Sequence, residues 1–102
     1  MRHFKAEFFK VLAHPTRIRI LDALREAPMT VAELQENLTL EQSNVSQHLG
    51  VLRAQGLVQT TREGTSIRYS ITDRAILQLL DAAREIYERR LLSSREHFDA
   101  TQ

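Results

Sequence analysis

The chain has 102 residues, of which 42% are hydrophobic and 26% are charged, with only three glycines and two prolines. This length and composition fit one packed domain over residues 1–102 and exclude a collagen-like or disordered chain. The absence of cysteine excludes a disulfide framework, a thiolate metal site and a cysteine nucleophile, and the net charge of +1 excludes a globally basic surface for nucleic acid.

The sequence carries no signal for insertion into a membrane. No apolar run approaches the roughly 18 residues that cross a bilayer, and the first residues, Met1 to Lys5, do not resemble the core of a signal peptide. We therefore expect a cytoplasmic protein with no membrane partner.

The first third of the chain has the apolar spacing of two helices. Phe4 and Phe8 belong to an amphipathic pattern over residues 3–12, whose apolar face is unusually aromatic. Pro15 suits the first position of a second helix, because the first turn of a helix has no use for the missing N–H. This second helix is expected to end before Ala27.

Two further helices are predicted in the middle of the chain. Thr30 and Glu33 fit a capping box, which marks the start of a third helix over residues 31–37. A fourth helix is expected over residues 42–55, and Gly56 favours its end because glycine adopts the left-handed conformation that closes a last turn. Its inward positions follow helical spacing and are Val45, Leu49 and Leu52.

From Val58 the apolar pattern changes from helical to alternating. Strands are predicted over 58–62 and 66–71, with Gly64 in the turn between them. An isolated hairpin is only marginally stable in water, so we expect it to pack against the helices.

A last helix is predicted from Asp73 to at least Leu92, about 30 Å at 1.5 Å per residue, and the polar tail over 93–102 is a candidate for fraying. Its apolar stripe, like the aromatic face of the first helix, exceeds what the middle of the chain can cover. We therefore expect the first and last helices to pair with those of a second copy in a twofold homodimer. The expected dimer residues are Phe4, Phe8, Leu12, Leu79, Ala83, Ile86 and Tyr87.

Four helices, a two-stranded hairpin and a last helix make up a mainly α fold of the winged helix-turn-helix type. The third and fourth helices are the helix-turn-helix, and the hairpin is the wing. The first turns of the fourth helix carry polar side chains with almost no charge, whereas a merely solvated face is usually rich in Glu, Lys and Arg. Because Asn and Gln form paired hydrogen bonds with adenine and small side chains let a helix enter a major groove, we expect these residues to read DNA bases: Gln42, Ser43, Asn44, Ser46, Gln47 and His48.

Three arginines near this helix are candidates for contacts to phosphate. Arg62 and Arg68 flank the tip of the hairpin, where a wing meets the DNA backbone, and Arg53 lies toward the end of the fourth helix. As single residues they could equally be solvated charges. Arg17 and Arg19, on the second helix, are further candidates that would add to the local positive field.

Other classes of function have weaker support. The sequence has no Gly-rich phosphate loop, no HExxH motif and no nucleophile with a supporting base, so we expect no enzymatic activity and no cofactor. The alternative to a DNA-binding regulator is a winged-helix module whose low-charge helix face binds another protein and whose DNA affinity is incidental. A pocket for a small effector between the terminal helices is a refinement of the first hypothesis, and the sequence does not identify the effector.

Three segments resemble the ArsR/SmtB-type transcriptional repressors. Ala13 to Leu21 (AHPTRIRIL) resembles the family's second helix, Gln42 to Arg53 (QSNVSQHLGVLR), followed by Gly56-Leu57-Val58, resembles its recognition helix, and Arg62-Glu63-Gly64 with Tyr69 is similar to its wing. The resemblance extends over roughly residues 5–92. It implies a homodimeric winged-helix repressor that binds an operator in double-stranded DNA and is released by a signal.

The resemblance does not extend to the family's metal sites. Thr30 and Ala32 occupy the positions of the Cys-x-Cys pair. For the site on the last helix, Asp81 matches the first ligand, but Ala83 stands where the paired His belongs. One matching ligand cannot hold zinc, which normally takes four, so the resemblance implies no metal. One minor metal hypothesis remains, in which His3 and His97 meet across the dimer.

Overall fold

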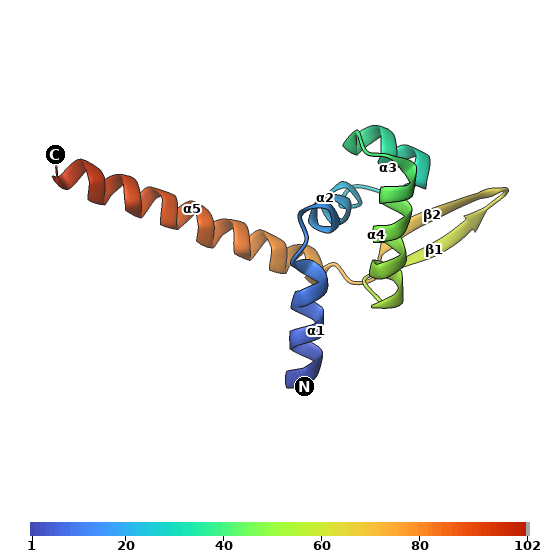
Figure 1. Cartoon of the computed structure of the whole chain (residues 1–102), viewed down its shortest axis with the longest axis horizontal. Coiled ribbons are helices and arrows are strands. Elements are labelled where there is room, and N and C mark those ends of the chain that lie inside the picture. The colour runs from blue at the N-terminus through green and yellow to red at the C-terminus, as the bar shows by residue number, and fades with distance from the viewer. Residues whose placement is uncertain (102) are drawn as a thin grey trace.

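The computed structural model describes the backbone of residues 1–101 and the side chains of residues 1–94. Over this part of the chain, helices and an antiparallel hairpin follow one another in the predicted order, and the fold is a winged helix-turn-helix (Figure 1). The elements are α1 (Arg2–Leu12), α2 (Pro15–Ala23), α3 (Val31–Leu38), α4 (Gln42–Ala54), β1 (Val58–Glu63), β2 (Ser66–Ile71) and α5 (Ala75–Thr101).

Local sequence signals account for the starts of α2 and α3. Pro15 is the first residue of α2, and the Nδ1 atom of the preceding His14 accepts a hydrogen bond of 3.3 Å from the backbone N–H of Thr16. The predicted capping box is confirmed at α3. The Thr30 hydroxyl accepts from the Glu33 N–H at 3.1 Å, and the Glu33 carboxylate accepts from the Thr30 N–H at 3.2 Å. These bonds satisfy N–H groups that a helix start otherwise leaves without a partner.

The core lies where α2, α3 and α4 meet the root of the hairpin. Aliphatic side chains fill it, and the largest of those fully buried are Ile20, Leu21, Val45, Leu34, Leu49, Leu52 and Val58. The three inward positions predicted on α4 are among them and are confirmed. Burying each such side chain contributes about 1.5–3 kcal/mol, so this cluster sets the rotation of α4 and decides which of its residues face outward.

A residue outside the two strands also forms backbone hydrogen bonds with the hairpin, which the sequence did not reveal. Val58 pairs with Ile71 and Glu63 with Ser66 at the two ends of the β1–β2 register. In addition, Met29 and Tyr69 exchange both backbone hydrogen bonds, at 3.0 and 2.8 Å. Met29 precedes α3, so this bridge attaches the root of the wing to the start of the helix-turn-helix.

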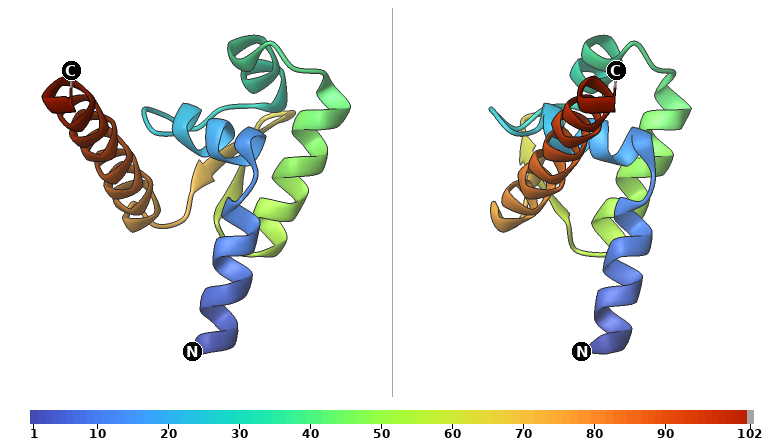
Figure 2. Two further views of the ribbon diagram at one scale, coloured as in Figure 1. Left: turned by 60° about the vertical axis from the view of Figure 1, so that its left-hand side comes forward. Right: turned by 90° about the vertical axis from the view of Figure 1, so that its left-hand side faces the viewer.

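The helices at the two ends of the chain project from the core in different directions (Figures 1 and 2). The radius of gyration is 16.8 Å, against about 13 Å for a compact domain of this length. Ile76 and Leu77, at the start of α5, are buried, but every described side chain from Asp81 to Ser94 is exposed. The backbone of α5 remains helical beyond Leu92, to Thr101. None of the helices in the described part of the chain is long and apolar enough to cross a membrane.

An ion pair links α5 to the end of α2. The Arg25 guanidinium, just after α2, donates to both carboxylate oxygens of Asp81, at 2.8 and 3.1 Å, and to Asp22 at 2.8 Å. The hydrogen bond from Arg25 is the main reason that the pKa of Asp81 lies below its usual range. Asp81 therefore serves as a surface anchor for α5.

The turn between α3 and α4 contains a residue in a strained conformation. Thr39 ends α3 with φ 55° and ψ 53°, in the left-handed region that β-branched residues rarely adopt. We expect Thr39→Gly to raise the free energy of unfolding by about 1 kcal/mol, because glycine adopts this conformation without a steric cost. Thr39→Ala, which retains the Cβ atom, is the control and should give little gain. Equal gains in chemical denaturation would contradict the strain at Thr39.

Candidate nucleic-acid interface

The outward face of α4 carries polar, uncharged side chains. Four of the six residues predicted to read bases are exposed on its first two turns, and Asn44 is half-buried beside them. The exposed four are Gln42, Ser43, Ser46 and Gln47. This face therefore offers amide and hydroxyl groups that can both donate and accept hydrogen bonds, and it carries no net charge.

His48 does not belong to this outward face. Its side chain is only 8% exposed, and its Nδ1 atom accepts a hydrogen bond of 3.2 Å from Nε of Arg17. The expectation that His48 reads bases is therefore corrected, because a ring held inside the fold cannot reach a base edge from this position. The helical period contained the signal, since residue 48 lies three positions after the buried Val45 and shares its face.

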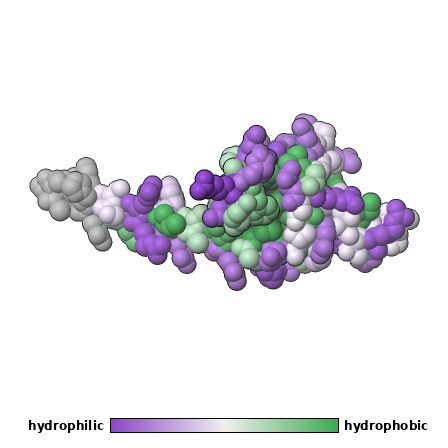
Figure 3. All heavy atoms as spheres, turned by 90° about the horizontal axis from the view of Figure 1, so that it is seen from below, coloured by the Kyte–Doolittle hydropathy of each residue, from purple (hydrophilic) through white to green (hydrophobic). Residues whose placement is uncertain are grey.

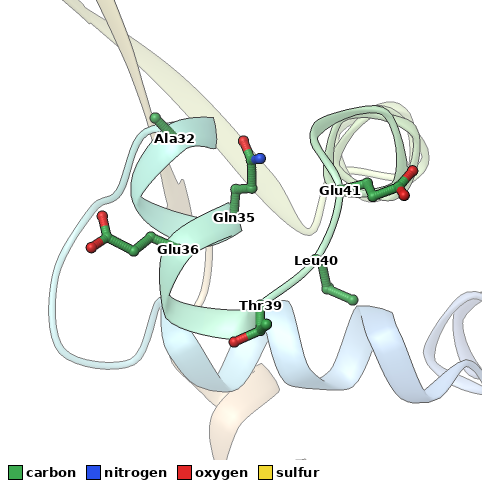
Figure 4. Close-up of a pocket in the computed structure, with 6 residues that line it drawn as sticks. All are labelled: Ala32, Gln35, Glu36, Thr39, Leu40 and Glu41. Atoms are coloured by element: carbon green, nitrogen blue, oxygen red, sulfur yellow. The ribbon is translucent and has the colours of Figure 1, made fainter.

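The turn before α4 forms a shallow groove of about 580 Å³. Figure 4 shows its lining side chains, which come from α3 and from the connection to α4: Ala32, Gln35, Glu36, Thr39, Leu40 and Glu41. Glu41 is the N-cap residue of α4 but makes no capping hydrogen bond with its side chain. Because the carboxylates of Glu36 and Glu41 would repel phosphate, the groove is not suited to hold the DNA backbone.

The two arginines of the wing differ in their surroundings. Arg62 is exposed on β1, opposite Ile67 near the tip. Arg68 instead turns toward the helices, donating to the carboxylates of Glu33 at 2.8 Å and Glu63 at 3.0 Å and to the backbone oxygen of Pro28 at 3.4 Å. The phosphate contact of Arg68 stays a prediction, and it would require the guanidinium to leave these partners.

Arg68 acts as a brace between the wing and α3. Its partner Glu33 is also the carboxylate of the capping box, so one side chain joins the start of α3 to the wing. Hydrogen bonds from Thr30 are the main reason that the pKa of Glu33 lies below its usual range, and the charge of Arg68 lowers it further. The brace thus joins the wing to the start of the helix-turn-helix at a second point, beside the bridge between Met29 and Tyr69.

The other arginines predicted near the interface also differ in whether they contact another helix. Arg53 is exposed in the last turn of α4, where its charge suits the negative end of the helix dipole and remains a candidate for phosphate contact. Arg17 and Arg19 instead donate to the backbone oxygens of Val11, at 3.2 Å, and Leu38, at 2.8 Å. These last two arginines join helices, and no local pattern in the sequence indicated their partners.

The predicted dimer residues fall into three groups. Leu12 is only 6% exposed, and its place in the dimer interface is corrected, because it packs in the core of a single copy. Phe8 and Leu79 are partly buried against that core. The other four project into solvent, and they are Phe4, Ala83, Ile86 and Tyr87. Figure 3 shows apolar side chains gathered over the middle of the face from which α1 projects, and again along α5.

The side chains of residues 1–94 contain no cluster of three or more His, Asp or Glu residues that could hold a metal ion. His3 is exposed on α1. Its hypothetical partner, His97, lies outside the described side chains.

Comparison with known proteins identifies relatives of this fold. A sequence profile described as "Bacterial regulatory protein, arsR family" matches residues 14–60. The chain is 51% identical over 92 residues to the uncharacterized HTH-type transcriptional regulator Rv0081 of Mycobacterium tuberculosis, covering 89% of this chain and 80% of Rv0081. It is 37% identical over 82 residues to the biofilm growth-associated repressor of Xylella fastidiosa, covering 80% and 72% of the two chains.

Solved structures agree with this likeness. The crystal structure of Rv0081 superimposes with a TM-score of 0.80 at 49% identity, covering 92% of this chain and 94% of that one. The solution structure of Mb0332 from Mycobacterium bovis, described as a homodimeric winged helix-turn-helix DNA-binding domain, superimposes with a TM-score of 0.78 at 27% identity, covering 87% and 82%.

The brace leads to a test on the free protein. We expect Arg68→Ala to accelerate hydrogen exchange at the backbone N–H of Tyr69, because loss of the contact to Glu33 lets the wing root separate from Met29 more often. The matched control is Arg62→Ala, which removes an arginine from the neighbouring strand and should leave this exchange rate unchanged. Equal rates in the wild type and Arg68→Ala would show that the brace does not hold the wing.

Proposed function

Because the chain belongs to the ArsR family of bacterial DNA-binding transcriptional regulators, we propose that it is a repressor that binds a palindromic operator as a homodimer. Such a protein acts in the cytoplasm, where the bacterial chromosome lies. The relative from Xylella fastidiosa that is named as a repressor supports repression rather than activation. Without cysteine, the chain does this with no thiolate metal site.

The uncharged outward face of α4 is the observation that carries the proposal. Gln42, Ser43, Ser46 and Gln47 are exposed together on the first turns of the helix, which is the end that a recognition helix presents to base edges. Amide side chains form paired hydrogen bonds with adenine, and hydroxyl groups bond to bases or phosphates. Asn44, which is half-buried, completes this reading surface.

Arg62 and Arg53 are proposed to contact the DNA backbone on either side of the reading surface. Arg62 is exposed near the wing tip and Arg53 in the last turn of α4, whereas Arg68 is committed to the brace. A second copy on the same duplex would double these contacts and so strengthen the electrostatic attraction.

The homodimer is proposed to form through α1 and the part of α5 beyond the core. Tyr87 and Phe4 are 63% exposed and Ile86 is 51% exposed, and large apolar side chains on two projecting helices indicate a surface that a partner covers. The homodimeric state of Mb0332 supports a second copy of the chain as that partner. A twofold axis would set the two α4 helices in successive major grooves, about 34 Å apart.

Selection of bound duplexes from a random library tests the operator and its symmetry together. We expect an imperfect palindrome whose half-sites are about 10 base pairs apart, centre to centre. Gln47→Ala should then weaken binding to the selected duplex by about 1–3 kcal/mol for each half-site and to a scrambled duplex much less. Arg62→Ala is the contrasting variant, and it should weaken both alike and reduce the salt slope by about one for each copy bound.

Two outcomes of the selection would contradict the proposal. Equal losses on both duplexes in Gln47→Ala would exclude base reading by α4. Recovery of no sequence above background, together with capture of a protein by the same helix face, would favour a winged-helix module for protein interaction.

The dimer surface has its own test. Ile86→Glu should raise the dimer dissociation constant at least about 100-fold, because each of two symmetry-related carboxylates would be buried against apolar side chains. Glu85→Lys changes the charge at the neighbouring position on the polar side of α5 and serves as the control. Sedimentation equilibrium measures both, and an unchanged constant in Ile86→Glu would place the interface elsewhere.

A further inference from the structure

We propose that Arg17 and His48 form a joint that holds the recognition helix α4 against the end of α1, and that binding of DNA requires the neutral form of His48. The inference rests on the proposed function, because it concerns how α4 is positioned for DNA. It makes His48 a positioning residue rather than a reader of bases.

Arg17 joins three helices through one guanidinium. Its Nη1 atom donates to the backbone oxygen of Val11, in the last turn of α1, at 3.2 Å. Its Nε atom donates to Nδ1 of His48, in the middle of α4, at 3.2 Å. Arg17 itself belongs to α2. A movement of α1 relative to the core would therefore pull on the recognition helix through a single side chain.

A second imidazole closes the other side of the joint. The ring centroids of His14 and His48 lie 4.3 Å apart, with the planes tilted by 55°. His14 is held in turn by the start of α2, where its Nδ1 accepts the N–H of Thr16. His48 is the polar side chain buried most completely in the described part of the chain.

The hydrogen bond specifies the protonation state of His48. A ring nitrogen that accepts from Arg17 carries no proton, so the proton of the neutral ring lies on Nε2. Protonation would place a second donor at Nδ1, facing the N–H of a guanidinium that is always charged. The contact would then change from a hydrogen bond to a repulsion.

The charges around His48 oppose its protonation. The ionisable groups that face it are His14, at the start of α2, and Arg17, within α2, and α1 contributes the uncharged backbone oxygen of Val11. None of the ion pairs between described side chains includes His48, His14 or Arg17. The pKa of His48 lies below its usual value mainly because the ring is buried, and the charges of His14 and Arg17 lower it further.

The direction of the pH effect follows from this arrangement. Above about pH 6.5, the usual pKa of histidine, the ring is neutral whether or not the joint is formed. Below it, the opened joint takes up a proton that the closed joint refuses, so the closed state loses stability as the pH falls. A simple increase in positive charge would instead strengthen attraction to DNA at low pH, which makes the two effects distinguishable.

The first experiment measures binding to the selected operator duplex at pH 7.5 and 5.5. We expect the wild type to bind about tenfold more weakly at pH 5.5, the cost of one charge-assisted hydrogen bond. His48→Asn should lose this dependence, because its amide oxygen takes the place of Nδ1, accepts from Arg17 and does not titrate. His3→Asn removes an exposed histidine and should behave as the wild type. Equal pH dependence in His48→Asn and the wild type would overturn the proposal.

The second experiment uses the free protein, so that failure of the joint and failure of the proposed function give different results. NMR titration of the imidazole protons should show that His48 titrates below the usual range and that Arg17→Gln moves it upward. A pKa of His48 in the usual range would overturn the joint, whether or not the protein binds DNA. A lowered titration in a protein that recovers no operator would instead refute the proposed function, and with it the requirement for neutral His48 in DNA binding.

Discussion

The arrangement of this protein depends on the burial of one aliphatic stripe of α4. Val45, Leu49 and Leu52 are completely buried between α2, α3 and the root of the hairpin. Once they are in place, the rotation of the helix is set, and Gln42, Ser43, Ser46 and Gln47 must face solvent. The exposed polar face of α4 is therefore a by-product of core packing, and its position depends on how tightly the core holds α4.

Polar side chains add directional constraints to this apolar packing. Arg17, Arg19, Arg25 and Arg68 each join elements that are distant in sequence, and they do so by binding backbone oxygens, carboxylates or the ring of His48. Guanidinium groups suit this task because their planar fork can donate in several directions at once. Arg25 and Arg68 meet carboxylates that offset part of their charge, whereas Arg17 and Arg19 bind uncharged backbone oxygens and keep theirs. Four of the 14 basic side chains of the chain thus hold elements together.

Arg68, His48 and Leu12 have partners that the sequence did not indicate, for one physical reason. The position of a residue within an element leaves open whether its side chain faces outward or meets another element. Their real partners, Glu33, Arg17 and the core, come from other elements, and a pattern of local spacing does not contain such contacts. His48 is the exception that a stricter use of helical period would have found, since it shares the face of Val45. The Met29 bridge to Tyr69 has no equivalent signal, because one residue paired with a strand has no period.

The order and type of the elements, the capping box, the start of α2 at Pro15 and the aliphatic stripe of α4 are properties of the sequence alone, because each depends on residues within about two helical turns. The absence of thiolate chemistry is equally a matter of composition. Tertiary structure decided which arginines contact other elements, how the wing root is attached, where α5 leaves the core and which histidine is buried. These features depend on side chains that meet only after the helices pack, and packing energy is a property of the whole core.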